Sequence, residues 1–367
     1  MKNTRKRANF VVVTIHFFNF SHDLALARNS ERYTAPPNVQ IMERDLAQLA
    51  GLLPQTAVAY HPLAPVWGWN RSLVNALRAS GYADLPTAEQ LADIRILSSR
   101  RTAVEMLPAL RRVLPAELTT GASWFAADLA TAESLIREFD VALLKAPLSG
   151  SGRGLRLVKG ALTEQQRNWA WRCIGEQGGV VVEPYYNKVA DFALEFLVGE
   201  GGADFLGLSV FETNANNVYA GNVIAPQYVL RQRIIKVVPT IDFEVIIDAV
   251  KRELCSRFAG RYLGPVGVDM MAVKEEGGMC RIHPCVEVNL RRTMGELSLH
   301  LMPLLADGCT GRFRLLYDKD STALRREVEG LPAAIYSQDG LLTGGTHLLT
   351  PLLGDTHYVA LLEVGNF

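Results

Sequence analysis

Apolar and polar residues alternate along the first part of the chain in the manner of strands joined by helices. Residues 10–18 form an apolar run that predicts a strand, and a polar turn separates it from an amphipathic helix at 41–53. The next segments predict a second strand at 56–60, a helix at 72–80 and a short third strand at 95–97. This alternation predicts an N-terminal domain, residues 1–97, built as an open α/β unit.

The pattern changes after this unit. We expect a helix over 100–113 that Pro108 interrupts, because proline removes a helical hydrogen bond and clashes with the preceding turn. Thr163 and Gln166 have the spacing of a capping box, so they mark the start of a helix that ends at a Gly-Gly pair. The remaining elements are a helix at 131–139 and three strands at 141–147, 155–158 and 180–186. Together they predict linker helices and a small α/β subdomain, residues 98–186.

Antiparallel strands are predicted for the next part of the chain. Phe192, Leu194, Phe196 and Val198 alternate with other residues, so they lie on one face of a strand. Two more strands are predicted at 205–213 and 218–225, and a helix at 243–258. A two-stranded hairpin follows at 266–290 and a last helix at 294–306. These elements predict an antiparallel-sheet core at residues 187–330. Short strands and turns are expected after it, at 331–367.

Composition and charge are typical of a globular protein. Of its 367 residues 49% are hydrophobic and 21% charged, and Lys+Arg and Asp+Glu both number 38. A basic surplus is usual in nucleic-acid-binding proteins, so we expect no nucleic-acid partner. The 5 scattered cysteines favour reduced thiols and a cytoplasmic location over a disulfide framework. The apolar run near the N-terminus is broken by polar residues and no later stretch is long enough for a bilayer, so we expect neither a signal peptide nor a membrane partner.

A lysine and a glycine-rich hairpin form the first candidate ligand site. Lys145 ends a predicted strand, and the loop after it contains Ser149, Gly150, Ser151, Gly152 and Gly154. Glycine lets backbone N–H groups approach phosphate oxygens, and the lysine supplies positive charge. The spacing fits neither a P-loop nor a dinucleotide-binding fingerprint, because the lysine precedes the glycines and a strand follows them. On its own, the motif fits a hairpin beside a surface lysine equally well.

Acidic residues on the predicted hairpin at 266–290 form the second candidate. Strand alternation brings Asp269 on one strand and Glu287 and Asn289 on the other to one face. Three oxygen ligands on adjacent strands suit Mg²⁺ or Mn²⁺ together with substrate phosphates. Arg291 follows at the next position on the same face and offers a fork of donors to a phosphate oxygen. Two carboxylates on a solvated sheet face are common, but Asn-x-Arg directly after the second one favours a functional site.

Two weaker patterns are also present. Cys280, His283 and Cys285 are of zinc-ligand type, but Cys280 has the opposite strand parity and no second cysteine pair lies close by, which disfavours zinc. The strand at 180–186 ends in Glu-Pro-Tyr and joins two predicted units. Its backbone suits the edge of an adenine ring, although an ordinary buried strand has the same pattern.

In this order, the segments resemble the ATP-grasp superfamily. The resemblance covers residues 100–300, and its motifs are the lysine with its glycine hairpin, Val-Glu-Pro-Tyr at 182–185, Asp269, and Glu-x-Asn-x-Arg at 287–291. It implies an α/β (α+β) ATP-grasp fold, with an N-terminal open α/β domain, a small lid subdomain and an antiparallel-sheet core. Many members have glutamate where this chain has Asp269, and the shorter side chain would shift one metal.

The resemblance also implies roles for individual residues. Lys145 would contact the α- and β-phosphates of ATP, and the glycine hairpin would close over the triphosphate. Magnesium or manganese would bind Asp269, Glu287 and Asn289, and Arg291 would face the reacting phosphate. Further contacts to the nucleotide would come from the side chain or backbone of Glu183, Pro184, Tyr185 and Tyr186, from Asp191, and from Arg100 or Arg101.

By this resemblance we expect an ATP-dependent ligase that activates a small-molecule or peptide carboxylate as an acyl phosphate and couples it to an amine or a thiol. A small-molecule kinase and a non-catalytic ATP-binding protein are the alternatives, and a homodimer is left open. A polar cluster after the first strand is a candidate for substrate recognition, with a helix-capping turn as the slightly favoured alternative. Its members are Asn19, Ser21, His22, Asp23, Arg28 and Tyr33.

Overall fold

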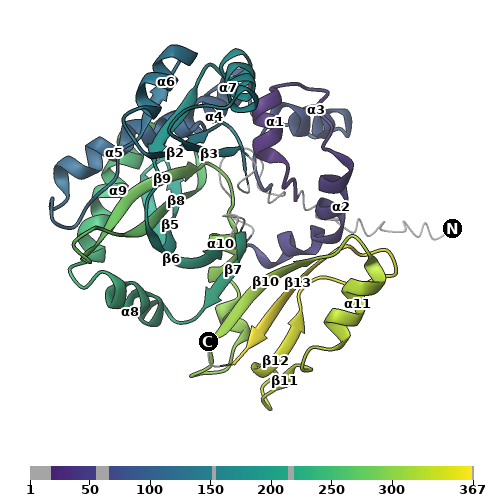
Figure 1. The fold of residues 1–367 in the computed structure, drawn as a ribbon. Coiled ribbons are helices and arrows are strands. Elements are labelled where there is room, and N and C mark those ends of the chain that lie inside the picture. Colours follow the sequence, from purple (N-terminus) through teal and green to yellow (C-terminus); the bar gives the residue numbers. More distant parts are fainter. Residues whose placement is uncertain (1–17, 55–65, 151–153, 214–218, 366–367) are drawn as a thin grey trace.

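Two β-sheets organise the computed structural model of the chain, which describes residues 18–54, 66–150, 154–213 and 219–365. Within these ranges one sheet has 4 strands and the other 9, and helices pack on both (Figure 1). The fold class, mixed α/β with antiparallel sheets, is therefore as predicted. The predicted strands at 10–18 and 56–60 fall outside these ranges except for Phe18, which is not in a strand. No helix of the described residues is long and apolar enough to cross a membrane.

The described part of the N-terminal unit is helical. Its elements are α1 (His22–Arg28), α2 (Pro37–Asp45), the 3₁₀-helix η1 (Ala47–Leu52), α3 (Arg71–Ala79) and α4 (Ala88–Leu97). The predicted strand at 95–97 is wrong, because these residues form the last turn of α4. Thr87 begins a reciprocal capping box, and Leu91, Ile94 and Leu97 are buried at helical spacing. A run of three apolar residues is too short to distinguish strand from helix.

The smaller sheet contains the lysine that precedes the glycine hairpin. Its strands are β1 (Trp124–Ala126), β2 (Val141–Lys145), β3 (Leu155–Lys159) and β4 (Val180–Pro184), in the antiparallel order β1-β4-β2-β3. Helices α6 (Leu129–Ile136) and α7 (Glu164–Gln177) pack on one face, around a core that includes Ala142, Leu144 and Val182. The predicted capping box at the start of α7 is confirmed. Because side chains alternate along a strand, Lys145 and Glu183 lie on the other face.

The larger sheet has the order β11-β12-β13-β10-β7-β6-β5-β8-β9. Its strands are β5 (Lys188–Gly199), β6 (Gly202–Thr213), β7 (Tyr219–Ile224), β8 (Gly264–Lys274), β9 (Cys280–Asn289), β10 (Gly311–Tyr317), β11 (Ile335–Tyr336), β12 (Leu342–Leu348) and β13 (Tyr358–Val364). The predicted β5-β6-β7 meander and β8-β9 hairpin are confirmed. Helix α9 (Phe243–Phe258) packs on the face of Phe192, Leu194 and Phe196, and α10 (Met294–Leu299) packs on the opposite face, where Glu195 lies.

Helix α5 (Arg100–Val113) lies between the sheets and contacts β4 and β9. Its bounds are as predicted, but Pro108 lies inside a continuous helix instead of interrupting it. Met106, Leu107 and Leu110 on either side of the proline are buried. Their packing outweighs the cost of an interior proline, which is about 3 kcal/mol.

Two further helices differ from the sequence predictions. No helix is predicted from the sequence at α8 (Gln227–Val237), which buries Leu230 and Ile234 and packs Val229, Ile235 and Val237 against the same core. The predicted helix at 294–306 is shorter, because α10 ends at Leu299 and the 3₁₀-helix η2 (Met302–Leu304) follows. Pro303 has no N–H to donate to the carbonyl of Leu299, which disfavours a longer α-helix here. Helix α11 (Ser321–Glu329) joins β10 to the last strands of the chain.

A segment after α5 runs beside β9 at the end of the larger sheet. The Thr120 N–H donates to the Ile282 carbonyl at 2.8 Å, and the Ile282 N–H donates to the Leu118 carbonyl at 2.9 Å. Thr119 and Ile282 form a parallel bridge between these two bonds. The segment 118–120 therefore continues the hydrogen-bonding pattern of the sheet beyond its last strand.

Candidate active site

Two facing carboxylates form the centre of the candidate site. In the β8-β9 register Asp269 lies opposite Glu287, and Gly267 lies opposite Asn289. The Asn289 amide donates to Asp269 Oδ2 at 3.1 Å. Burial raises the pKa of Asp269 to about 7, and the charge of Glu287 contributes to the increase. The structure thus brings the three predicted metal-ligating residues together on one sheet face.

The chemistry of this set fits a hard divalent cation. Two carboxylates and one amide supply oxygen donors, and Mg²⁺ binds one or two carboxylates together with waters and phosphates. A cation would also offset the repulsion between Asp269 and Glu287. Zinc does not fit, because the described residues contain no metal-holding group of three His, Cys, Asp or Glu. His283 and Cys285 are both buried, and burial raises the pKa of the Cys285 thiol, which also disfavours it as a nucleophile.

Arg100, in the first turn of α5, connects the acidic pair, Asp269 and Glu287, to the glycine hairpin. Its Nη2 lies 2.9 Å from Glu287 Oε1 and donates to Oε2 at 3.0 Å. The same guanidinium donates to the hydroxyl and the carbonyl of Ser149, at 2.6 and 3.0 Å, and to the Ala146 carbonyl at 2.6 Å. The Arg100 side chain is 5% exposed, so these bonds fix the start of the hairpin close to the acidic pair.

Lys145 and Glu183 form a buried ion pair on the smaller sheet. Lys145 Nζ lies 2.6 Å from Glu183 Oε2, and the two side chains are 5% and 4% exposed. The other carboxylate oxygen accepts a hydrogen bond from the Ser123 hydroxyl at 3.0 Å. Glu183, predicted as a nucleotide contact, is therefore the counter-ion of the predicted phosphate-binding lysine in this structure.

The described ends of the glycine hairpin are closely packed. The Ala146 N–H donates to the Gly154 carbonyl at 2.8 Å. A Cβ on Gly154 would lie 2.0 Å from Ser149 Oγ, so glycine is needed at this close approach. Ser151 and Gly152, two of the predicted nucleotide contacts, lie outside the described residues.

The linker after β4 already uses several of its backbone groups. The Tyr185 N–H donates to the Val141 carbonyl at 3.0 Å, and the Tyr186 carbonyl accepts from the Lys188 N–H at 2.9 Å. Pro184 has no N–H. The Tyr185 N–H is thus used within the protein, whereas the Tyr186 carbonyl keeps a second lone pair, and the adenine contact of this segment stays a prediction.

Asp191 and Arg101 have different positions relative to the acidic pair. Asp191 pairs with Lys188 at 2.5 Å and lies on the sheet face of Asp269, because Ala193, two residues later, is opposite Asp269. Arg101 is 62% exposed, with its Nε 3.1 Å from Glu105 Oε1. Of the two arginines proposed at the start of α5, Arg100 is thus the one that the structure brings to the site.

Arg291, which follows β9, pairs with Asp23 of α1. Its Nε and Nη2 donate to Asp23 Oδ1 and Oδ2, at 3.2 and 3.0 Å. Burial favours the neutral acid, but the Arg291 guanidinium holds the pKa of Asp23 below its ordinary value. A Cβ on Gly150 would lie 2.4 Å from Asp23 Oδ2, so the first hairpin glycine rests on this carboxylate.

Other members of the N-terminal polar cluster stabilise local structure. Asn19 makes hydrogen bonds of 2.7 and 3.2 Å with the carbonyl and N–H of Gly68. The Ser21 N–H donates to Glu43 at 2.8 Å. His22 is buried, and burial lowers its pKa to about 4. None of these contacts is a helix cap, because Ser21, the N-cap residue of α1, makes no side-chain capping hydrogen bond. Asp23 is the member that reaches the acidic face through Arg291.

The sequence patterns assign no role to Glu195, which lies on the same sheet face as the acidic pair. Its carboxylate accepts from the Ser209 hydroxyl at 3.0 Å and from the Thr293 hydroxyl at 2.8 Å. Burial raises its pKa to about 8, and Asp269 contributes to the increase. Glu195 could have been found in the sequence as a carboxylate inside a predicted strand whose opposite face, Phe192, Leu194, Phe196 and Val198, is apolar.

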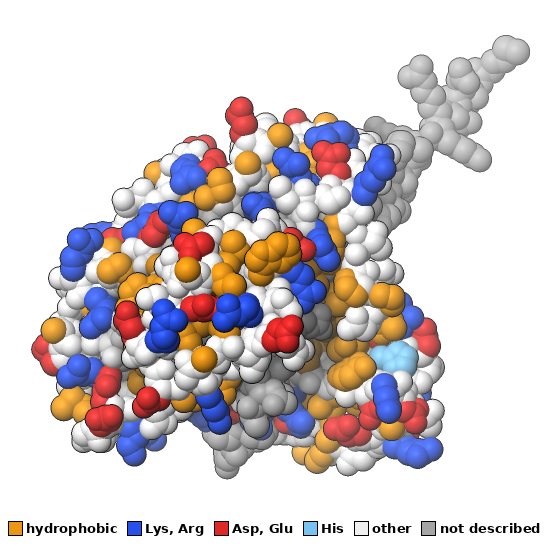
Figure 2. All heavy atoms as spheres, turned by 45° about the horizontal axis from the view of Figure 1, so that its top comes forward, with side chains coloured by type: hydrophobic (Ala, Val, Ile, Leu, Met, Phe, Trp, Pro, Cys, Tyr) orange, Lys and Arg blue, Asp and Glu red, His pale blue; other side chains and the backbone are white. Residues whose placement is uncertain are grey.

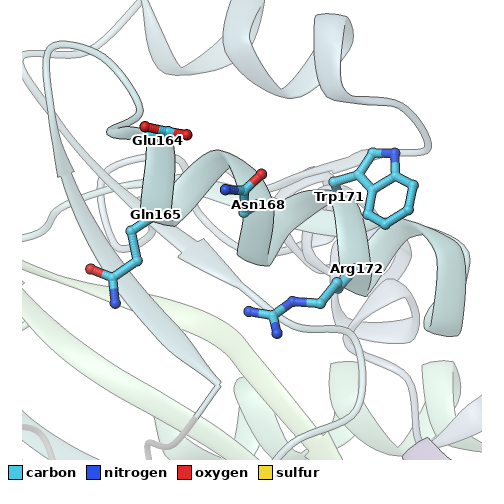
Figure 3. A pocket seen from close by; sticks show the side chains of 5 residues that line it. All are labelled: Glu164, Gln165, Asn168, Trp171 and Arg172. Carbon is cyan, nitrogen blue, oxygen red and sulfur yellow. The ribbon is translucent and has the colours of Figure 1, made fainter.

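A surface hollow among the described residues does not gather polar groups from several elements. This hollow, of about 620 Å³, is lined by Glu164, Gln165, Asn168, Trp171 and Arg172 (Figure 3). All five project from α7, whereas ligand sites gather polar groups from several elements. Figure 2 shows Lys and Arg side chains interspersed with Asp and Glu, so the face in view carries no basic stripe.

Comparisons with known proteins give structural similarity alone. No family model matches the chain, and no curated protein matches it. Similar solved structures include N5-carboxyaminoimidazole synthetase from Staphylococcus aureus complexed with ADP, at 14% identity, with 75% of this chain and 69% of that chain covered and a TM-score of 0.46.

Two others are the biotin carboxylase domain of 2-oxoglutarate carboxylase from Hydrogenobacter thermophilus with MgADP, and L-amino acid ligase from Bacillus licheniformis. The first is 14% identical, with 82% of this chain and 76% of that chain covered and a TM-score of 0.46. The second is 12% identical, with 82% and 74% covered and a TM-score of 0.42. Because these identities are 12–14% and these TM-scores are 0.42–0.46, we infer the function from the side chains of this protein alone.

Proposed function

We propose that this chain is an ATP-dependent ligase that activates a carboxylate as an acyl phosphate and couples it to an amine or a thiol. The observation that carries the proposal is the position of Arg100, which bonds both Glu287 and Ser149 at the start of the glycine hairpin. A cation site and a phosphate-binding loop would therefore lie within reach of one guanidinium. Phosphoryl transfer needs this combination, because it depends on positioning and charge neutralisation.

The nucleotide would be ATP with Mg²⁺ or Mn²⁺. Asp269, Glu287 and Asn289 would hold the cation, which when bound neutralises phosphate charge. Lys145 supplies a second positive charge directly before the hairpin, and the glycines let backbone N–H groups approach phosphate oxygens. All 5 cysteines are free, which supports a reducing, cytoplasmic location.

A carboxylate needs activation because its charge repels nucleophiles and hydroxide is a poor leaving group. In the proposed reaction a carboxylate oxygen attacks the γ-phosphorus of ATP, the bond from phosphorus to the bridging oxygen breaks, and ADP leaves. The amine or thiol then attacks the acyl carbon, phosphate leaves with the C–O electron pair, and the attacking group loses its proton. Arg291 would stabilise the charge of the transferred phosphoryl group.

An ATP-dependent hydroxylamine trap tests this function. Pools of amino acids, peptides and small polyacids are offered as carboxylates, and ADP release identifies the substrate. Hydroxylamine then converts an acyl phosphate into a hydroxamate. Glu287→Gln should abolish hydroxamate formation, whereas Glu276→Gln, exposed in the turn of the same hairpin, should leave it unchanged. Circular dichroism confirms that both variants are folded.

Two other outcomes separate the alternatives. A stable phosphate ester that resists hydroxylamine would establish a small-molecule kinase. Binding of Mg·ATP without turnover of any carboxylate would establish a non-catalytic ATP-binding protein.

A further inference from the structure

Arg291 is anchored by three of its own N–H groups. Nε and Nη2 donate to the two Asp23 oxygens at 3.2 and 3.0 Å, and Nη1 donates to the Arg292 carbonyl at 3.2 Å. A guanidinium has five N–H donors. One donor on each terminal nitrogen therefore has no partner among the residues that the structure describes. A pair of donors on one guanidinium edge matches two oxygens of a phosphoryl group.

The anchored guanidinium follows the predicted cation ligands directly in the chain. Arg291 lies two positions after Asn289, the last residue of β9. The side chains of Arg291 and Asp23 are 16% and 19% exposed. The ion pair is thus shielded from most solvent, while part of the Arg291 surface stays open.

Asp23 also supports the start of the glycine hairpin. The three atoms closest to an added Cβ at Gly150 all belong to Asp23, with Oδ2 nearest at 2.4 Å. Because two hydrogen bonds from Arg291 fix this carboxylate, it cannot turn away without breaking them. One carboxylate of the N-terminal unit therefore contacts both the hairpin and the arginine.

We propose that Asp23 is the positioning residue for Arg291. It holds the guanidinium so that the two remaining donors meet the phosphoryl group that ATP transfers, and it supports the hairpin at Gly150. Asp23 acts through Arg291 and does not bind the phosphate itself, because two anions repel each other. The inference rests on the proposed function, which supplies the nucleotide and the role of Arg291.

Asp23→Asn tests the inference through the preference for ATP over ADP. Titration calorimetry measures the affinity for a non-hydrolysable ATP analogue and for ADP, each with Mg²⁺. Arg291 would contact only the phosphoryl group that ADP lacks, and a misplaced charge-assisted hydrogen bond lowers affinity about tenfold. The ratio of the two affinities should therefore fall about tenfold, while the affinity for ADP changes by less than about twofold.

Glu43→Gln is the matched control, because Glu43 holds the same segment through the Ser21 N–H. It should leave the ratio unchanged, and an equal fall would reveal a general effect of α1 and overturn the inference. An unchanged ratio in Asp23→Asn would also overturn it, as would a higher ratio, which would mean that Asp23 competes with phosphate for Arg291. If the wild-type protein binds neither nucleotide, the proposed function itself is wrong.

Gly150→Ala gives a second test in the same assay. The added methyl group would displace the carboxylate of Asp23, so the ratio should fall in the wild-type background. In an Asp23→Ala background the same substitution meets no carboxylate and should change the ratio by less than about twofold. Additive effects of the two substitutions would overturn the coupling between Gly150 and Asp23.

Discussion

The two carboxylate-containing pairs of the candidate site differ in the charge of their partners. Lys145 and Glu183 have opposite charges, lie 2.6 Å apart and are almost fully buried, so they satisfy each other without a ligand. Asp269 and Glu287 are both acidic and face each other across two strands, with Arg100 bonded to Glu287. The first pair stabilises the protein as it stands, whereas the second gains from a bound cation. Phosphates would have to share Lys145 with Glu183.

The largest expected effect is on stability, at the first pair. Lys145→Ala leaves Glu183 buried without its counter-ion, which should lower the free energy of unfolding by about 3–5 kcal/mol. Urea denaturation followed by circular dichroism measures this change. Lys159→Ala, at an exposed lysine of β3, should change it by less than about 0.5 kcal/mol. A loss below about 1 kcal/mol in Lys145→Ala would contradict the structural role of the pair.

The next effect is a pH dependence that comes from the burial of Glu195 in the larger sheet. The pKa of Glu195 is raised from 4.5 to about 8, so folding favours its neutral form. Its stabilising contribution is complete below pH 4.5 and is lost as the pH rises towards 8. We expect a loss of about 3 kcal/mol in unfolding free energy between about pH 5 and 7.5 from this group.

Glu195→Gln isolates that contribution, because the amide keeps a neutral polar side chain. Denaturation at several pH values should show a flatter decline in the variant. Glu296 and Asp269, whose pKa values are both raised to about 7, contribute to the slope that remains. His22 and His283, whose pKa values are lowered from 6.5 to about 4, oppose it below pH 6.5 in both proteins. An equal slope in the two proteins would show that Glu195 is ionised in the folded state near neutral pH.

Substitution in the second pair should affect binding more than stability. Glu287→Gln removes a cation ligand, so affinity for the ATP analogue with Mg²⁺ should fall about hundredfold. Its effect on unfolding should be smaller than that of Lys145→Ala, because the amide oxygen of Gln can still accept a hydrogen bond from Arg100 and the loss of one of two facing negative charges relieves repulsion with Asp269. Calorimetry and urea denaturation measure the two quantities, with Glu276→Gln as the control. Retention of full Mg²⁺-dependent affinity would remove the cation site from the proposal.

The smallest effect should come from Arg101, beside the arginine that connects the two regions. Arg101→Ala breaks an exposed pair with Glu105, which should cost about 0.3–0.5 kcal/mol in stability. Nucleotide affinity should not change. If Arg101→Ala weakened binding as much as Glu287→Gln, the assignment of Arg100 to the site would be wrong.

Local periodicity was enough to predict the acidic face and most strands around it. Asp269, Glu287 and Asn289 alternate along their strands, and alternating side chains share a face wherever two strands pair. The capping box of α7 is local in the same way, because its partners are three residues apart. The strand prediction at 95–97 failed because a run of three apolar residues is too short to distinguish strand from helix. Helix α8 was missed although Leu230, Ile234 and Val237 have helical spacing.

Contacts between distant segments could not be predicted in this way. Asp23 and Arg291 are 268 positions apart, and no periodic pattern connects a helix of the N-terminal unit to the end of β9. The choice between Arg100 and Arg101 depends on the helical phase, since neighbouring residues point about 100° apart around the axis. That phase is set by the packing of α5 between the two sheets.

The segment 118–120 has a consequence for self-association. An unpaired strand at the edge of a sheet is a template to which the strand of another chain can bind, and such pairing leads to aggregation. Two hydrogen bonds to Ile282 occupy the edge of β9 next to the acidic face. The other edge strand, β11, is only 2 residues long, which makes it a poor template. At one end of the nine-stranded sheet a segment thus covers the edge around Ile282, and at the other end the edge strand is short.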